Sequence, residues 1–418
     1  MPTSLKTAPP TIDPLFAEAW QAGLAVLSPT PAQQEHGLEL HRSLTICESY
    51  GFLPDIWGEA AAEFHGAGRD GRSFVDFQRR LSHLRTIGAT ANAANGRAFH
   101  AALRQAGIHG IVQPVNDYGE SLICAVQRIA AIRHLCLSFP DTLHQVVDAD
   151  GIERARAAQA TAIIYSLTGL PIFGTGDMTD PTQLLEWVLI WHGLGVRFMH
   201  LGYNRRNLFA DGCTESNDGG LSDLGRDLIQ MMNEVGIIVD VPHSSRRSLL
   251  EACQLSRRPV IASHMGCRAV WDGVRCKSDE EIKAIAATSG YVGIFGVPWL
   301  LGNDTDIRLM LEHIRHAVNL VGPEHVVIGA DTGFNLAIPG QRTPHPGAWR
   351  RKQAGGWNEH SRMGREAGQP LQGNLAWTNK PLLTIGLVQM GLSDEAIAQI
   401  HFGNLKRVLD SLPPTGQP

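Results

Sequence analysis

Short apolar runs bounded by turn residues recur along the chain and predict eight buried strands. They lie at 44–50, 110–115, 161–167, 196–201, 236–241, 259–263, 291–296 and 325–330. Segments with helical spacing of apolar residues, such as 221–235 and 278–289, separate the later strands. Strand–helix alternation favours a parallel sheet, and about eight such units favour closure into a (β/α)8 TIM barrel of the α/β class.

Three regions fall outside this alternation. Residues 1–43 are expected to form an N-terminal helical extension, and 52–108 a mostly helical excursion between the first two strands. Residues 336–374 are rich in Gly, Pro, Arg and Trp without a period, which predicts a long loop at the active-site face. Because 418 residues suffice for one barrel with additions, we expect a single domain over 1–418.

The composition indicates which binding partners and which cellular location to expect. The formal net charge of -5 leaves no basic surplus for a phosphate backbone, so we expect no nucleic acid. The seven cysteines form no CxxC pair and favour a reduced, cytoplasmic interior. No apolar stretch is long enough for a bilayer, and the first residues lack the pattern of a signal peptide, so we expect no membrane association.

Candidate chemistry lies where the later strands end. His243 and His264 each stand just past an apolar run, a third run leads to Asp331, and Arg275 lies in the loop after His264. The carboxyl ends of barrel strands face one mouth, so these residues are expected to converge. Neutral imidazole is a good zinc ligand, and a carboxylate can take a proton from a metal-bound water. The pattern therefore indicates a metal-dependent hydrolase.

Several ordered segments resemble the renal, or membrane, dipeptidase family of zinc peptidases, which have amidohydrolase-like barrels. These segments are 194–215, 219–245, 258–270, 325–331 and the terminal 401–409. The resemblance implies that His243 and His264 bind zinc and that Arg275 holds the substrate carboxylate. It also implies that Asp331 contacts a metal and handles the proton of the attacking water. A homodimer is the default expectation for such a protein.

The sequence departs from this family at three positions. The first strand lacks the His-x-Asp pair of the family and places either Glu48 and Tyr50 or Ser49 and Gly51 there, depending on register. Where a glutamate should bridge two metals, the third strand has Thr168 or its neighbour Leu167, and Tyr203 replaces a histidine that polarises the scissile carbonyl. The family's two-metal site therefore cannot form in its usual composition.

Two functions follow. The first is hydrolysis of a dipeptide or similar small carboxylated amide, with one zinc ion on His243, His264 and Asp331, with or without Glu48. Its expected catalytic residues are Asp331, Tyr203 and Glu48, and its substrate-binding residues Arg275, Tyr50 and Asn204. The alternative is a barrel without a metal that performs acid–base chemistry of the lyase or isomerase type, or binds a small carboxylated ligand. Glu48 itself is either functional or bridged to an arginine, because an unpaired carboxylate in an apolar strand is costly.

Overall fold

Eight parallel strands form the central sheet, one for each apolar run. A computed structural model describes residues 12–66, 74–116, 122–171, 181–303, 306–336 and 373–413, so nearly all of the expected loop at 336–374 lies outside the described residues. The strands neighbour one another in the order β1 (Cys47–Glu48), β3 (Gly110–Pro114), β5 (Thr161–Leu167), β6 (Val196–His200), β7 (Ile238–Asp240), β8 (Val260–Cys267), β10 (Val292–Ile294) and β11 (Val326–Ile328).

The first and last strands meet, which confirms the (β/α)8 barrel. The backbone N–H of Ser49 donates to the carbonyl of Ile328 at 2.9 Å, and that of Asp331 donates to the carbonyl of Tyr50 at 3.1 Å. A Cβ atom at Gly293 or Gly329 would lie 2.0 or 1.9 Å from the carbonyl oxygen of Ser263, so glycine is required where these strands pass close to β8. Buried apolar side chains of the strands pack together in one core cluster, among them Val112, Ile164, Phe198, Ile238, Ile261 and Val327.

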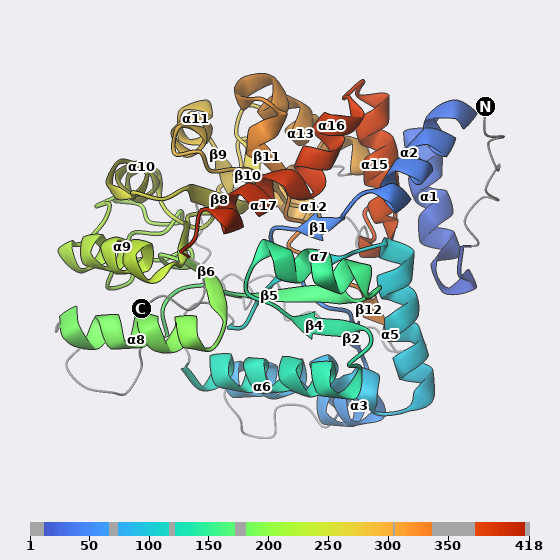
Figure 1. The fold of residues 1–418 in the computed structure, drawn as a ribbon, viewed down its shortest axis with the longest axis horizontal. Helices are drawn as coiled ribbons and strands as arrows, with labels where there is room; N and C mark the ends of the chain where they lie inside the picture. The colour runs from blue at the N-terminus through green and yellow to red at the C-terminus, as the bar shows by residue number, and fades with distance from the viewer. Residues whose placement is uncertain are drawn as a thin grey trace.

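Helices surround the sheet (Figure 1). They include α6 (Leu122–Ser138), α7 (Ala149–Ala157), α8 (Pro181–Gly193), α9 (Asp223–Val235), α10 (Arg246–Leu255), α11 (Asp279–Ala287) and α13 (Ile307–Val321). The helices expected at 221–235 and 278–289 are α9 and α11. Each begins where a serine, Ser222 or Ser278, caps the first turn by accepting a backbone N–H.

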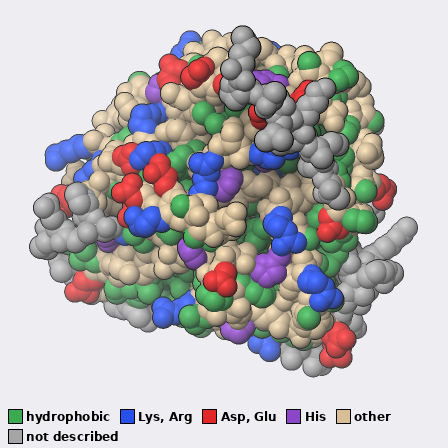
Figure 2. All heavy atoms as spheres, turned by 45° about the vertical axis from the view of Figure 1, so that its right-hand side comes forward, with side chains coloured by type: hydrophobic (Ala, Val, Ile, Leu, Met, Phe, Trp, Pro, Cys, Tyr) green, Lys and Arg blue, Asp and Glu red, His purple; other side chains and the backbone are tan. Residues whose placement is uncertain are grey.

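A helical hairpin precedes the barrel and packs on its C-terminal helices (Figure 1). It consists of α1 (Ala17–Leu27) and α2 (Pro31–Ser43), and its main partner is α15 (Lys380–Gln389). His41 Nδ1 lies 2.7 Å from Thr384 Oγ1, and the side chain of Gln389 donates to the carbonyl of Leu27. Figure 2 shows the side of the molecule that carries these helices, where acidic and basic side chains are interspersed.

The remaining strands and α-helices lie between the elements already named and at the end of the described part. The excursion after β1 contains β2 (Asp55–Ile56), α3 (Glu59–Gly66), α4 (Phe74–Thr86) and α5 (Ala93–Ala106), and β2 pairs with β12 (Asn335–Leu336). β4 (Leu143–Gln145) joins β5, β9 (Cys276–Lys277) joins β8, and α12 (Pro298–Leu301) follows β10. The end is formed by α16 (Asp394–Ala398), a π-helical turn (Gln399–Gly403) and α17 (Asn404–Asp410).

Among the described residues no helix combines the length and the apolar character needed to cross a membrane.

Candidate functional site

The two histidines predicted to converge lie side by side, but only His243 follows a strand end, three residues after β7, whereas His264 lies inside β8 and not just past an apolar run as predicted. His243 Nε2 and His264 Nε2 are 3.1 Å apart, and both side chains are buried. β8 holds one more residue than the facing stretch of β10, since Ala262 pairs with Val292 but Met265 pairs with Ile294. Such a bulge re-aims a side chain. It falls at Ser263 and His264, and therefore helps to set the direction of the His264 ring.

The Nδ1 atom of each ring, on the side away from the other histidine, has a hydrogen-bond partner. Asn204 Oδ1 lies 2.7 Å from His243 Nδ1, and Ser263 Oγ lies 2.9 Å from His264 Nδ1. An amide oxygen can only accept, so His243 carries its proton on Nδ1 and turns the Nε2 lone pair towards His264. Burial and the positive charge of Arg275 hold the pKa values of both imidazoles well below their usual range. Both rings are therefore neutral near pH 7.

A cavity of about 160 Å³ opens beside this pair. Its lining contains four of the predicted site residues, and the full set is Tyr50, Phe52, Pro114, Asn116, Thr168, Tyr203, His243 and Asp331. The Tyr50 ring stacks on His264 at 3.9 Å between centroids, and the Tyr203 ring lies 4.1 Å from that of His243. Two aromatic rings therefore flank the histidine pair.

Thr168 marks the change on the third predicted strand. It lies just after β5, lines the cavity, and its backbone N–H and hydroxyl both reach Asn116 Oδ1, at 2.7 and 3.0 Å. The position at which the resemblance implies a metal-bridging carboxylate is therefore occupied by a neutral hydroxyl that is already hydrogen-bonded.

Asp331 and Arg275 supply the charges near the cavity. Burial raises the pKa of Asp331 to about 7, and the opposing charge of Arg275 limits the rise. Asp331 has a left-handed φ of 55°, a conformation that Asp and Asn tolerate better than most residues. Arg275 is buried, and its Nε and Nη2 donate to the carbonyls of Pro242 and His264 at 3.3 and 3.2 Å. The guanidinium thus braces the backbone that carries both histidines.

Asn204 and Glu48 have contacts that differ from their predicted roles. Asn204 does not line the cavity; it contacts His243 and so orients that ring. Glu48 accepts from Trp377 Nε1 at 3.0 Å and from Lys380 Nζ, and it does not line the cavity. Of the two alternatives for Glu48, the bridged one is observed, although its cationic partner is a lysine and not an arginine. Burial lowers the pKa of Lys380 to about 7.

Sequence reasoning missed His200. This residue ends β6, is fully buried, and its ring centroid lies 5.5 Å from those of His243 and His264 and 5.4 Å from that of Tyr50. Its Nε2 lies 3.0 Å from Oδ2 of Asp240 on β7. The available signal was a histidine at the end of the apolar run at 196–201. The site therefore contains three imidazoles, not two.

The histidine pair fits one metal ion but not two. Two imidazole nitrogens on one tetrahedral zinc at ~2.0–2.1 Å are separated by roughly 3.3 Å, close to the observed 3.1 Å. In metal sites, a ligating histidine is usually oriented by a hydrogen bond from its other ring nitrogen, and the Nδ1 contacts of His243 and His264 are of this kind. However, the described ranges contain no group of three or more His, Cys, Asp or Glu that could hold a metal. The two-metal centre implied by the resemblance is therefore not assembled by these residues.

Comparison with known proteins identifies the family that this sequence resembles. Residues 92–341 match the family model described as membrane dipeptidase (peptidase family M19). Dipeptidase tcpJ from Claviceps purpurea is 28% identical over 226 residues, covering 52% of this chain and 51% of that protein. Dipeptidase verJ from Clonostachys rogersoniana is 27% identical over 226 residues, covering 52% and 49%. The chain thus matches about half the length of these relatives.

Solved structures show the same fold. An amidohydrolase from Pseudomonas aeruginosa superposes with a TM-score of 0.65 at 22% identity, over 90% of this chain and 98% of that one. The probable dipeptidase PvdM from the same organism gives 0.64 at 18% identity, over 91% and 99%. The family model spans more than half of the sequence and includes His243, His264, Arg275 and Asp331. The chain therefore belongs to the membrane dipeptidase family, peptidase family M19.

Proposed function

We propose that this protein is a dipeptidase-like hydrolase that cleaves a dipeptide or similar small carboxylated amide at an altered site. The observation that carries the proposal is that His243 lines the cavity together with Tyr203 and Asp331, while His264, outside the lining, lies with its Nε2 3.1 Å from His243 Nε2. Family membership supports the reaction type. The cavity of about 160 Å³ is small against the ~300–1,000 Å³ of common ligand sites, which favours a substrate with few atoms.

Each residue has a proposed role. The Asp331 carboxylate accepts the proton of the attacking water, and a pKa of about 7 lets it exchange that proton near neutral pH. The Tyr203 hydroxyl supports the oxygen that becomes negative in the tetrahedral intermediate. The fixed positive charge of Arg275 attracts the substrate carboxylate, and Tyr50 forms an aromatic wall against His264. Asn204 keeps His243 in the required tautomer.

A single zinc ion is the proposed cofactor. His243 and His264 would hold it through Nε2. Asp331, the third ligand expected from the sequence, does not form a metal-holding group with them in the described residues, so water or substrate would complete the coordination. When bound, such an ion supplies Lewis acidity and lowers the pKa of a coordinated water. Thr168 and Glu48 are not expected to be ligands of this ion, because the Thr168 hydroxyl is already hydrogen-bonded and the Glu48 carboxylate is paired with Lys380.

The test combines metal analysis with an amide-hydrolysis assay. The protein as purified, and the same protein after zinc is added, is incubated with a panel of small dipeptides, and released amino acids are measured. We expect close to one zinc per chain and turnover that falls at least about 100-fold in His243→Ala and in Asp331→Asn. Asparagine tolerates the left-handed φ of 55° at position 331, so Asp331→Asn removes charge without backbone strain. Absence of hydrolysis in all zinc-loaded samples would overturn the proposal.

One observation favours the second function, a protein that works without a metal. Both histidine rings can satisfy their hydrogen bonds without an ion. In that arrangement the Ser263 hydroxyl donates to His264 Nδ1, His264 Nε2–H donates to His243 Nε2, and His243 Nδ1–H donates to Asn204 Oδ1. Acid–base chemistry of the lyase or isomerase type, or binding of a small carboxylate, then needs no cofactor. Zinc content near zero together with chelator-insensitive activity or binding supports this alternative.

A further inference from the structure

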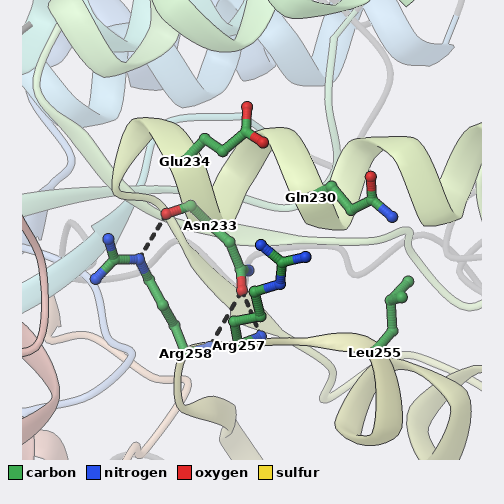
Figure 3. A pocket seen from close by; sticks show the side chains of 6 residues that line it. All are labelled: Gln230, Asn233, Glu234, Leu255, Arg257 and Arg258. Carbon is green, nitrogen blue, oxygen red and sulfur yellow. Dashed lines mark hydrogen bonds between the residues drawn. The ribbon is translucent and has the colours of Figure 1, made fainter.

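A second hollow lies far from the histidine pair, at the opposite end of the same two strands. Its volume is about 490 Å³, and it is lined by Gln230, Asn233, Glu234, Leu255, Arg257 and Arg258 (Figure 3). Three of these residues lie in α9, which leads into β7, and the others lie at the end of α10 and in the loop that leads into β8. His243 and His264 lie beyond these strand starts, towards the other mouth of the barrel.

Asn233 is the central polar group of this hollow, and its amide orientation is fixed. Its Oδ1 accepts the backbone N–H groups of Arg257 and Arg258 at 2.6 and 3.1 Å, and the hydroxyl of Ser256 at 3.2 Å. Backbone N–H groups can only donate, so the atom that faces them must be the oxygen. The NH₂ group of Asn233 therefore points away from the loop.

That NH₂ group has no acceptor within the described residues. Asn233 is 7% exposed, and its Nδ2 is buried without a hydrogen-bond partner. A buried donor without an acceptor is unfavourable, and such a group in a native protein calls for an explanation. Because Asn233 lines the hollow, a small shift of its amide would bring Nδ2 within reach of an acceptor atom of a bound molecule.

Arg257 adds a positive charge beside this donor. Its side chain is exposed and forms no ion pair within the described part of the chain. Figure 3 shows its guanidinium turned towards α9, between Asn233 and Gln230. Arg258, in contrast, is engaged by the carbonyls of Asn233 and Ser411. One free guanidinium thus lies beside the side chain of Asn233, whose buried NH₂ group has no acceptor within the described residues.

These groups indicate the class of ligand. A guanidinium and an amide NH₂ group both donate, and a carboxylate presents two oxygens to such a pair. Glu234 lies on the same helix one turn from Gln230 and disfavours a doubly charged anion, while Leu255 offers an apolar contact. We propose that this hollow binds the carboxylate of a small monoanionic organic acid with an apolar tail, through Arg257 and Asn233.

Calorimetry with 4-methylpentanoate tests the proposal on the full chain. Asn233→Asp keeps an acceptor for the loop but replaces the NH₂ donor by a negative oxygen, and Arg257→Gln removes the charge. Arg315→Gln is the matched control, since Arg315 is exposed on α13, outside the lining of the hollow. We expect the Kd to rise at least about tenfold in both hollow variants and to stay unchanged in the control. The neutral 4-methylpentanamide should bind at least about tenfold more weakly than the acid.

Several outcomes would overturn the assignment. Absence of binding by the unmodified protein means that the hollow is filled by solvent alone. Binding that survives in Arg257→Gln places the acid elsewhere, including the candidate site near Arg275. Tighter binding of inorganic phosphate than of 4-methylpentanoate would exclude the monoanionic class. If Asn233→Asp fails to fold, Arg257→Gln still decides the matter, because its side chain is exposed.

Discussion

His200 Nε2 lies 3.0 Å from Asp240 Oδ2, and both side chains are completely excluded from solvent. Oδ1 of Asp240 also accepts the backbone N–H of Ser263 at 2.8 Å, which links this pair to the strand that carries His264. A fully buried imidazole whose carboxylate partner is removed has no solvent to replace it. His200 Nε2 and Asp240 Oδ2 have no hydrogen-bond partner within the described residues, so their contact is a close polar pair without hydrogen-bond alignment, and it holds the third imidazole of the site.

Asp240→Asn is expected to lower the free energy of unfolding by about 3 kcal/mol, since it breaks a buried polar pair without changing side-chain size. Urea denaturation at pH 7.5 measures the effect. The control is Asp410→Asn on the protein surface, where Lys406 lies 2.9 Å from Asp410 with the carboxylate half exposed. That change should cost less than about 0.5 kcal/mol. Equal costs for the two variants would contradict the supporting role of Asp240.

The pairing of Glu48 with Lys380 and Trp377 also predicts a stability effect. Lys380→Met leaves a buried carboxylate without its cation and is expected to cost about 3–5 kcal/mol of unfolding free energy. Adding Glu48→Gln to Lys380→Met should recover part of this loss, because the unpaired charge is removed as well. If Glu48→Gln alone abolished hydrolysis while leaving stability unchanged, Glu48 would belong to the reaction and not to the core.

Acid should destabilise the protein through buried histidines. Burial lowers the pKa values of His41, His109 and His313 to about 4, from an ordinary 6.5. The unfolded chain therefore takes up protons near pH 6.5, whereas the folded chain does so only near pH 4. The stability these neutral rings contribute is complete above about pH 6.5 and is lost as the pH falls to about 4.

Urea denaturation between pH 7 and pH 4 measures this dependence. A fully buried ring such as His41 accounts for about 3 kcal/mol across the window. His41→Gln is expected to flatten the pH dependence by that order, even though it lowers stability at pH 7. A slope unchanged in His41→Gln would show that other groups are responsible.

Asn204 offers a test of metal binding that leaves both candidate ligands intact. Its φ is 52°, so Asn204→Gly preserves the backbone while removing the acceptor for His243 Nδ1. Loss of such an outer partner typically weakens metal affinity about 10–100-fold. Competition with a chromogenic chelator measures zinc affinity in both proteins. Equal affinities would mean that the ion is not held through an oriented His243.

The barrel and the convergence of His243, His264 and Asp331 could be predicted from sequence. Strands of a parallel barrel are buried on both faces and appear as continuous apolar runs, and their ends share one mouth. The position of a residue just after such a run was therefore informative. The pairings β2–β12 and β8–β9 were not predicted, because β2, β9 and β12 contain two residues each and leave no periodicity.

The environments of Glu48 and His200 could not be predicted. Glu48 meets Trp377 and Lys380, more than 300 positions away, and no local pattern encodes such a contact. His200 lies in an apolar run and reads as a core residue. Its inward direction depends on an irregular register, in which Tyr165 pairs with Val196 but Ser166 pairs with Phe198. A shift of this kind arises from packing of whole strands and is absent from hydrophobic periodicity.

The contact between the α1–α2 hairpin and α15 has a consequence for synthesis on the ribosome. His41 and Thr384 are 343 positions apart, so the hairpin emerges long before its partner helix exists. At ~5–20 residues per second, it waits roughly 20–70 s with its apolar face uncovered. Nascent chains of this protein are therefore expected to need chaperone protection of α1 and α2 until α15 has been synthesised.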